Sequence, residues 1–326
     1  MCTLPSNKRT ELIMKHVLTL TLSPTVDKST TVDKIVAEQK LDCDAPKFEP
    51  GGGGINVSRA LKRLGLASVA VFPSGGLTGQ RLQDLLDEEG IDQHPVTTKN
   101  LTRENFIVVN RTTNEQFRFG MPAPELLVRE EEAILKLVKQ LAPKTSYIVA
   151  SGSMPQGIGD DFLAKVARIA HKEHARLVVD TSGEALKQAV DEGVYMLKPN
   201  QNELSKLTGL RVDDHDEVEE AARKIVDKGK CEIIVVSMGP LGAQTVTKDF
   251  SEHIHAPTVK KRSTVGAGDS MVAGMVYGCS KGYDLRHMVR MGIACGSAAT
   301  MNPGTELFQK DDADRLYQWL VKRIKN

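Results

Sequence analysis

The sequence has almost no net charge and no long apolar run. Its 43 Lys and Arg residues against 42 Asp and Glu residues leave a formal net charge of +1. A chain so balanced offers no overall basic field, which argues against binding to nucleic acid or to an anionic membrane surface. No apolar stretch approaches the roughly 20 residues that a membrane-spanning helix needs. We therefore expect no nucleic-acid or membrane partner, and we expect any anionic ligand to be held by local groups.

Cysteine is also scarce. The five cysteines are odd in number and lack the close spacing of zinc motifs. A chain of 326 residues can bury a large core and needs no disulfide to hold it together. Residues 1–13 are polar and aperiodic, without the apolar core of a signal peptide. We expect these residues to form a disordered N-terminal extension, and the protein to be cytoplasmic with reduced thiols.

Short β-branched runs alternate with segments of helical periodicity. The predicted strands are 16–22, 69–72, 147–150, 177–180, 195–198 and 233–237, and the predicted helices include 55–64, 79–89, 130–141 and one that starts near Met271. Strands separated by helices are typical of a parallel sheet with helices on both faces. The sequence therefore predicts an α/β fold with a doubly wound, mostly parallel sheet.

Two segments, 30–48 and 105–119, interrupt this alternation. The second contains two β-runs around a turn, which predicts a hairpin. Because both segments follow core strands, we expect them to meet over one edge of the sheet as an antiparallel patch. The chain is thus predicted to form one domain over 14–326, with a small β lid from about 28–50 and 103–121. The unburied face of such a lid can cap a site or pair with a second subunit.

The segment Val265-Gly266-Ala267-Gly268-Asp269 directly precedes a predicted helix. Small residues at a helix N-terminus leave backbone N–H groups accessible to a phosphate or to a developing anion. A carboxylate in that first turn is available as a catalytic base, and Asp269 is the candidate. Asp269 equally suits a helix cap, so this segment alone does not separate the two roles.

Four consecutive glycines, Gly51 to Gly54, lead into another helix. Glycine loses more backbone entropy on folding than any other residue, so we expect close backbone approach to be required here. A sugar or a phosphate against the main chain meets that requirement, and a flexible turn before a helix is the alternative. The run has neither the Gly-Lys-Ser/Thr ending of a P-loop nor the spacing of a dinucleotide fingerprint.

Further candidate groups stand where predicted strands end. Asn200 and Glu203 lie three residues apart at a helix start, where their oxygens suit Mg²⁺ or a capping box. The glycine-rich segment 237–243 suits a phosphate contact or an ordinary hairpin turn. Asp27 and Arg103 are solvated charges by default. Ligands of α/β sheets, however, bind beyond the carboxyl ends of the strands, where the strand-exit acids and glycines gather.

Taken together, these segments resemble the ribokinase-like, or PfkB, family of carbohydrate kinases from about Met14 to the C-terminus. The family's glycine pair matches Gly51 to Gly54, its Asn-x-x-Glu matches Asn200 to Glu203, and its closing Gly-Ala-Gly-Asp matches Gly266 to Asp269. Linking phrases such as Ser151-Gly152-Ser153-Met154-Pro155 resemble the 6-phosphofructokinase isozyme 2 branch most closely.

The resemblance implies a glycolytic reaction, the ATP-dependent phosphorylation of fructose 6-phosphate at its 1-hydroxyl to fructose 1,6-bisphosphate. It implies Mg²⁺ and K⁺ as cofactors, ATP as cosubstrate, and a homodimer formed through the lid. Asp269 would be the general base, with the amides of Gly266, Ala267 and Gly268 holding the developing charge. The residues implied at the binding sites are Asp27, Gly52, Gly53, Gly54, Asn56, Arg103, Ser153 and Lys40 for the sugar phosphate; Lys198, Asn200, Ser237, Gly239, Gly242 and Gly268 for the nucleotide; Asn200 and Glu203 for Mg²⁺ through water; and Ser263, Val265, Asn302 and Gly304 for a monovalent cation.

Three positions bear on the assignment within the family. Gly53 stands where the 1-phosphofructokinase and tagatose-6-phosphate kinase branches usually have lysine, which favours 6-phosphofructokinase over these two alternatives. Asp42 stands where close relatives have a basic lid residue, and Glu306 replaces an arginine beside the cation loop. A catalytically inactive nucleotide-binding relative is a further alternative. The joint presence of a candidate base and a candidate metal pair argues against it.

Overall fold

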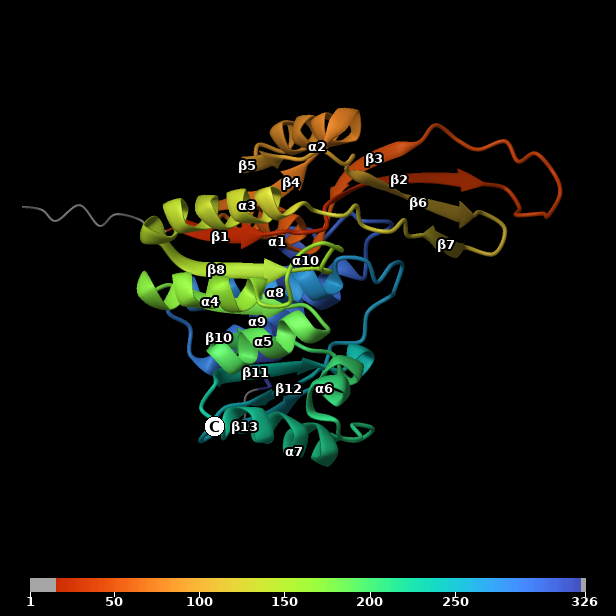
Figure 1. Ribbon diagram of the computed structural model, residues 1–326. Helices are drawn as coiled ribbons and strands as arrows, with labels where there is room; N and C mark the ends of the chain where they lie inside the picture. The colour runs from red at the N-terminus through yellow and green to blue at the C-terminus, as the bar shows by residue number, and fades with distance from the viewer. Residues whose placement is uncertain (1–15, 324–326) are drawn as a thin grey trace, which may run out of the picture.

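The computed structural model describes residues 16–323, so the expected extension at 1–13 lies outside the described residues. A nine-stranded sheet forms the centre of the molecule, in the order β13-β12-β11-β10-β9-β8-β1-β4-β5 (Figure 1). Its strands are β1 His16–Leu20, β4 Ser68–Ser74, β5 Asp92–Thr97, β8 Thr145–Ser151, β9 Arg176–Asp180, β10 Val194–Leu197, β11 Cys231–Ser237, β12 Ala243–Val246 and β13 Ser251–Ile254.

The seven strands β11, β10, β9, β8, β1, β4 and β5 run parallel, and the antiparallel pairs are β11 with β12 and β12 with β13, at one edge. The predicted α/β fold with a doubly wound, mostly parallel sheet is therefore confirmed. The strand order reverses between β1 and β8. From β1, the chain adds β4 and β5 toward one edge of the sheet, and it then adds β8 to β11 toward the opposite edge. Such a reversal opens a crevice at the carboxyl ends of the two strands.

Helices cover both faces of this sheet (Figure 1). One face carries α1 Gly53–Arg63, α8 Ala267–Ser280, α9 Leu285–Ala299 and α10 Lys310–Val321; the other carries α3 Val128–Leu141, α4 Phe162–Lys172, α5 Glu184–Glu192, α6 Gln201–Thr208 and α7 His215–Val226. Side chains alternate between the two cores, as in β9, where Leu177 and Val179 face one core and Val178 the other. Burial on both faces explains why the central strands are continuous apolar runs.

A second, four-stranded sheet projects from the carboxyl-end edge of the first (Figure 1). Its order is β3 Lys47–Gly51, β2 Thr25–Val32, β6 Arg103–Asn110 and β7 Glu115–Phe119. The predicted hairpin is confirmed, since β6 and β7 pair antiparallel. The expectation of a purely antiparallel patch is wrong, because β2 and β6 pair parallel. Both strands leave the same edge of the large sheet, after β1 and after β5, so they run in the same direction.

The helix α2, Gly76–Glu88, lies where the two sheets meet and shares a small core with β2 and β4 through Val26, Phe72 and Leu82. This packing fixes the root of the small sheet against the large one. Over residues 16–323, none of the helices combines the length and the apolarity that crossing a membrane requires.

Candidate active site

The crevice at the strand reversal is lined by the ends of β1 and β8 and by the start of α1. The glycine run brings α1 very close to both strand ends. A Cβ atom at Gly53 would lie 2.4 Å from the hydroxyl of Ser151, and one at Gly54 would lie 2.6 Å from the carbonyl oxygen of Leu20. Gly52 has a φ of 115°, a conformation that side chains rarely adopt. The protein's own backbone therefore accounts for the glycines, and a ligand is not needed to explain them.

Asp269 lies in the first turn of α8 and points into this crevice. Its carboxylate accepts hydrogen bonds from the side-chain amide of Asn56, at 3.0 Å, and from the hydroxyl of Ser151, at 3.1 Å. The residue that caps α8 is Gly266, in the left-handed conformation. Asp269 is therefore not the capping residue of α8, which was the alternative role that the sequence allowed. Its two partners come from α1 and from the end of β8, so three distant segments meet at one carboxylate.

The environment of Asp269 favours its neutral form more than water does. Burial, and then the neighbouring carboxylate of Asp180, raise the pKa of Asp269 to about 6, while the hydrogen bonds from Asn56 and Ser151 and the charge of Lys198 oppose this shift. A base with a pKa just below neutral pH is ionised under working conditions yet binds a proton readily. The geometry and the pKa both suit proton abstraction from a hydroxyl.

Lys198, at the exit of β10, is fully buried beside this base. Its ammonium lies 3.0 Å from the carboxylate of Asp180, at the end of β9. Burial opposes the charge of Lys198, but Asp180 outweighs it, with smaller contributions from Glu203 and Asp269, and the pKa of Lys198 is raised. A Cβ atom at Gly268 would lie 3.5 Å from that ammonium, so the charge stands at the N-terminus of α8. An anion there meets both a cation and unpaired amides.

Sequence reasoning missed Asp180 and Ser151. Asp180 ends a strand that the sequence predicts correctly, and its place among the strand-exit acids was the available signal. Ser151 belongs to the segment Ser151-Gly152-Ser153-Met154-Pro155, in which the family resemblance implied only Ser153 as a contact to the sugar. Both missed residues contact the groups around Asp269 directly.

Asn200 and Glu203 form a capping box at the start of α6. The Asn200 side chain accepts from the amide of Glu203 at 2.9 Å, and Glu203 Oε2 accepts from the amide of Asn200 at 2.8 Å. The capping alternative is therefore confirmed. The other carboxylate oxygen of Glu203, Oε1, takes no part in the capping box. The charge of Glu203 also contributes to raising the pKa of the buried Lys198.

The segment 237–243 joins β11 to the antiparallel β12 through a short 3-10 turn at Gly239–Leu241. It is the hairpin turn that the sequence offered as one of two interpretations. A Cβ atom at Gly242 would lie 1.9 Å from the carbonyl oxygen of Ile254, so this glycine permits close contact with the end of β13. Ser237 donates its amide to the carbonyl of Pro199, which ties this turn to the start of α6.

The small sheet brings a second group of polar residues to the crevice. Asp27 on β2 is buried and accepts from the side-chain amide of Asn105 on β6, at 3.0 Å. Arg103, also on β6, donates to the carbonyls of Met121 and Ser23. Within residues 16–323 its Nε atom is buried without a hydrogen-bond partner. An unpaired, buried N–H is costly, so the protein itself does not fully satisfy the guanidinium of Arg103.

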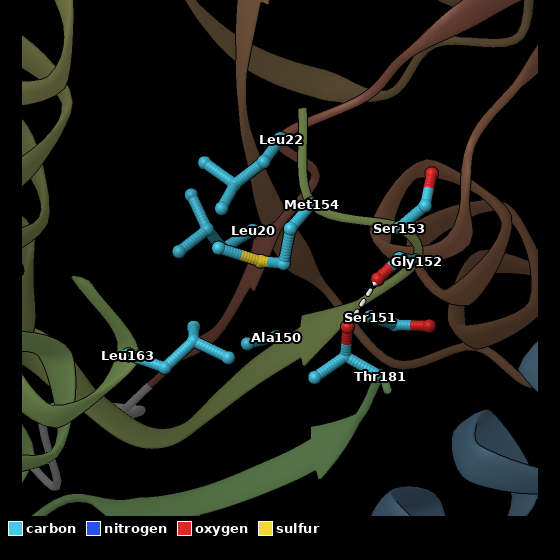
Figure 2. A pocket seen from close by; sticks show the side chains of 9 residues that line it. All are labelled: Leu20, Leu22, Ala150, Ser151, Gly152, Ser153, Met154, Leu163 and Thr181. Atoms are coloured by element: carbon cyan, nitrogen blue, oxygen red, sulfur yellow. Dashed lines mark hydrogen bonds between the residues drawn. The ribbon is translucent and has the colours of Figure 1, made fainter. Parts of the chain in front are cut away.

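Ser153 lies beyond Ser151, on the loop that follows β8. Figure 2 shows the hydroxyls of both serines pointing away from Leu20 and Leu163, which line a small cavity behind the loop. Its space of about 10 Å³ is too tight for a sugar. The hydroxyl of Thr181 donates to the carbonyl of Gly152 at 2.7 Å and fixes the loop (Figure 2). Ser151 and Ser153 also line this cavity, with their hydroxyls pointing away from its leucines (Figure 2).

Lys40 is the one expected sugar-phosphate residue that the chain does not bring to the crevice. It lies on the loop between β2 and β3 with its side chain 92% exposed, 3.9 Å from the equally exposed Asp42. An ion pair between such exposed groups contributes little. Within a single chain, Lys40 contacts none of the residues around Asp269 among those described.

The expected cation loop contains Ser263, Val265, Asn302 and Gly304. The hydroxyl of Ser263 donates to the carbonyl of Gly304 at 2.8 Å and accepts from the amide of Val265 at 3.2 Å. The Asn302 amide nitrogen donates to the carbonyl of Leu307 at 2.9 Å. Glu306 pairs with Lys47 on β3 at 2.5 Å. The carboxylate of Glu306 thus connects the loop to the small sheet.

A carboxylate in the first turn of a helix, at the strand reversal and beside a buried lysine, suits an enzyme that transfers a phosphoryl group to a hydroxyl. The chain belongs to the pfkB family of carbohydrate kinases, which it matches over residues 19–312. It is 43% identical over 312 residues to the ATP-dependent 6-phosphofructokinase isozyme 2 of Escherichia coli (strain K12), across 95% of this chain and 100% of that protein. The resemblance inferred from the sequence motifs is confirmed.

Solved structures show the same similarity. The phosphofructokinase-2 from Escherichia coli in complex with potassium superposes with a TM-score of 0.91 at 42% identity, covering 94% of this chain and 100% of that one. The same enzyme in complex with fructose-6-phosphate superposes with a TM-score of 0.89 at 41% identity, with the same coverage. The likeness thus extends over both sheets and is not confined to the motifs.

Proposed function

We propose that this enzyme uses ATP to phosphorylate the 1-hydroxyl of fructose 6-phosphate, giving fructose 1,6-bisphosphate. The observation that carries the proposal is the buried carboxylate of Asp269, held by Asn56 and Ser151 at the start of α8. The similarity to a phosphofructokinase-2 structure that contains fructose-6-phosphate supports the choice of sugar. Since both substrates are cytoplasmic metabolites, a cytoplasmic location accompanies this proposal.

On the sugar side, Asp27, Asn56, Ser153 and the backbone of Gly52 to Gly54 hold the hydroxyls. Arg103 binds the phosphate already present on the substrate. Its guanidinium is half-buried and lies near Asp27, and its planar set of donors suits charge-assisted hydrogen bonds to phosphate oxygens. A pocket on the small sheet, lined by Lys28, Glu104, Asn105, Phe106 and Met121, adjoins this arginine and its Met121 contact.

On the nucleotide side, the phosphates of ATP lie against Lys198 and the amide of Gly268. Asn200, Ser237, Gly239 and Gly242 line the remainder of the nucleotide, since the hydrogen bond from Ser237 to Pro199 joins their two segments. This arrangement sets the γ-phosphate between the cation of Lys198 and the carboxylate of Asp269.

In the reaction, Asp269 accepts the proton of the 1-hydroxyl as that oxygen attacks the γ-phosphorus. Asn56 and Ser151 hold the carboxylate in place for this transfer. The amides of Gly266, Ala267 and Gly268, together with Lys198, stabilise the negative charge on the transferred group. Positioning and electrostatics therefore supply most of the catalysis, as expected for phosphoryl transfer.

The residues present fit Mg²⁺ bound largely by water and phosphate. Within residues 16–323 no cluster of three or more His, Cys, Asp or Glu side chains is arranged to hold a metal ion. Glu203 Oε1 remains available beside Asn200, while Oε2 is used in the capping box. One carboxylate oxygen suits an ion that keeps several waters. When bound with ATP, Mg²⁺ would neutralise charge on its β- and γ-phosphates.

The cation loop fits K⁺ in part. The hydroxyl of Ser263 and the carbonyl of Gly304 lie 2.8 Å apart, and both are neutral oxygens. Asn302 uses its amide nitrogen in bonds to the backbone and keeps its oxygen, and the carbonyl of Val265 belongs to the same loop. Bound there, K⁺ would lend positive charge to the region of the Gly266 amides.

The proposal also assigns the small sheet a role as a lid and as the interface of a homodimer. Phe117 and Phe119 on its outermost strand β7, and Met121 two residues beyond that strand, are exposed by 38%, 49% and 45% of their surfaces. Apolar side chains on an edge strand suit burial against a second sheet. Lys40 would then reach the sugar phosphate of the partner subunit. The proposed lid comprises residues from about 28–50 and 103–121.

A comparison of acceptors tests the proposed function. ADP release would be followed with fructose 6-phosphate, tagatose 6-phosphate and fructose 1-phosphate at equal concentration, and the product would be identified by its phosphate positions. We expect kcat/KM to be highest for fructose 6-phosphate, with transfer to the 1-hydroxyl. Preference for another acceptor would assign the chain to one of the alternative kinases, and no acceptor-dependent ADP release would indicate an inactive relative.

A further inference from the structure

Arg59 is a buried arginine on α1 that touches three other parts of the molecule. Only 2% of its side chain is exposed. Its Nε and NH2 atoms donate to the carboxylate of Glu89, the residue that follows α2, at 2.7 to 3.0 Å. Its remaining nitrogen, NH1, donates to the carbonyl of Pro50 at 3.0 Å and approaches the carbonyl of Thr305 at 3.5 Å. One guanidinium thus joins the glycine run, the cation loop and the end of α2.

The same NH1 atom also contacts the side chain of Asn56. It lies 3.3 Å from Asn56 Oδ1, while Asn56 Nδ2 donates to Asp269 at 3.0 Å. The two ends of an asparagine amide are nearly identical in shape, so only their partners decide which end faces which way. An arginine can only donate, and an ionised carboxylate can only accept. Arg59 on one side of Asn56 and Asp269 on the other therefore select the same orientation.

We propose that Arg59 is a positioning residue for the reaction: it holds the amide of Asn56 with the N–H toward the catalytic carboxylate. This inference rests on the proposed role of Asp269 as the base and goes beyond it. Without Arg59, only Asp269 selects the orientation of the Asn56 amide, and the reversed orientation, with the oxygen toward Asp269, becomes accessible. A carbonyl oxygen beside the carboxylate favours protonation of the base, which removes its ability to accept the substrate's proton.

Glu89 is required for this arrangement. A buried guanidinium without a counter-charge is strongly destabilising, and the bidentate bond to Glu89 supplies that charge. It also fixes the plane of the guanidinium, so that NH1 points at Asn56. A lysine at position 59 keeps a cation beside Glu89, but a single ammonium cannot reproduce the planar fork that reaches both partners.

The surrounding charges are accounted for on both sides. Asp180 and Lys198 act on Asp269, whereas Arg59 acts electrostatically on Asp27 and Arg63 and forms an ion pair with Glu89. Arg59 does not contact the carboxylate of Asp269 itself and acts through Asn56. Its effect on the base is therefore separable from a direct charge effect by changing Asn56.

The test compares Arg59→Lys with Arg63→Lys. Arg63 lies one turn further along α1 and donates to the carbonyl of Phe308 at 2.6 Å, so it is a matched arginine that has no contact with Asn56. We expect the acidic limb of kcat/KM to move upward by about one pH unit in Arg59→Lys, the effect of losing one hydrogen bond to a charged group. The limb should not move in Arg63→Lys, and the KM for ATP should be unchanged in both.

The double variant distinguishes positioning from general damage. Asn56→Ala removes the link, so Arg59→Lys should cause no further movement of the limb in that background. An unchanged limb in Arg59→Lys, or a shift of the same size in the Asn56→Ala background, would overturn the inference. Carboxyl NMR shifts of Asp269 in the unliganded protein report the same pKa without turnover. An inactive wild type would therefore refute the proposed function while leaving this inference open to its own measurement.

Discussion

The side-chain nitrogen of Asn56 and the carboxylate oxygen Oδ2 of Asp269 lie 3.0 Å apart, although 213 positions separate the two residues in the sequence. This contact joins the first turns of two helices, α1 and α8, across the crevice between β1 and β8. Both helices point their N-termini at the same place. Their amides favour negative charge there, while burial disfavours it on the carboxylate, and these opposing effects set the behaviour of the base.

The first prediction concerns the pH dependence of the wild-type enzyme. Since burial and Asp180 raise the pKa of Asp269 to about 6, kcat/KM should be constant above pH 7 and fall about tenfold per unit well below pH 6. A pH profile with fructose 6-phosphate and saturating ATP measures this. A limb near pH 4, the range of an ordinary aspartate, would contradict the assigned environment.

The second prediction concerns Asp269→Asn. The asparagine keeps the shape of the side chain but cannot accept the proton, so turnover should fall by roughly 10²- to 10⁴-fold. ATP affinity, measured by calorimetry, should change little, because Lys198 and the amides of α8 are retained. Turnover close to that of the wild type would refute the role of Asp269 as base.

The same variant should also be more stable than the wild type at high pH. The folded-state pKa of Asp269, about 6, lies above the ordinary aspartate value of 3.8, so this group's contribution to stability is present below about pH 4 and is lost as the pH rises through 6. At pH 8 the ionised, buried carboxylate therefore destabilises the fold, and Asp269→Asn should gain about 1–3 kcal/mol. Denaturant unfolding at pH 8 and at pH 5 measures this, and the gain should shrink at pH 5. An equal gain at both pH values would argue against a titration effect.

The fourth prediction concerns Arg103→Met. Losing a charge-assisted hydrogen bond to the sugar phosphate should lower kcat/KM for fructose 6-phosphate by roughly 10- to 100-fold. Slow transfer to unphosphorylated fructose should not change. Arg111, at the far end of β6 and paired with Asp33 and Asp44, provides the control, and Arg111→Met should leave both substrates unaffected. Equal losses with fructose and its phosphate would show that Arg103 is structural.

The fifth prediction concerns Mg²⁺. Glu203→Gln keeps an oxygen to accept from the amide of Asn200, so α6 should start normally while the charge is lost. The Mg²⁺ concentration for half-maximal activity should rise about tenfold, the scale of an outer-sphere contact. Glu217, which forms the same capping box with Asp214 on α7, is the matched control. A comparable shift in Glu217→Gln would attribute the effect to helix capping.

The central strands were predictable because burial on both faces makes them uninterrupted apolar runs. The two edge strands of the large sheet, β5 and β13, were not predicted, since they are only partly buried and lack an uninterrupted apolar run. The parallel pairing of β2 with β6 also has no local signal, because it depends on where both strands leave the large sheet.

The residues of the candidate site also differ in how far the sequence could predict them. Asp269, Asn200 and Glu203 stand in short motifs at helix starts, where spacing alone suggests chemistry. Asp180 and the Arg59–Glu89 pair are defined by contacts between distant segments, which no periodicity records. The glycine run predicts a close approach of the backbone to another group. The sequence could not show that this group is the ends of β8 and β1, at Ser151 and Leu20.

The two sheets divide the proposed substrate contacts between them. Asp27 and Arg103 belong to the small sheet, while Asp269 and Lys198 belong to the large one. If the small sheet closes over the crevice as the proposed lid, substrate affinity and catalytic geometry both depend on that one motion. If the closed state were populated a tenth of the time, the apparent dissociation constant for the sugar would be about ten times its intrinsic value. Substitutions at the root of the small sheet, far from any ligand, would then alter KM through that population alone.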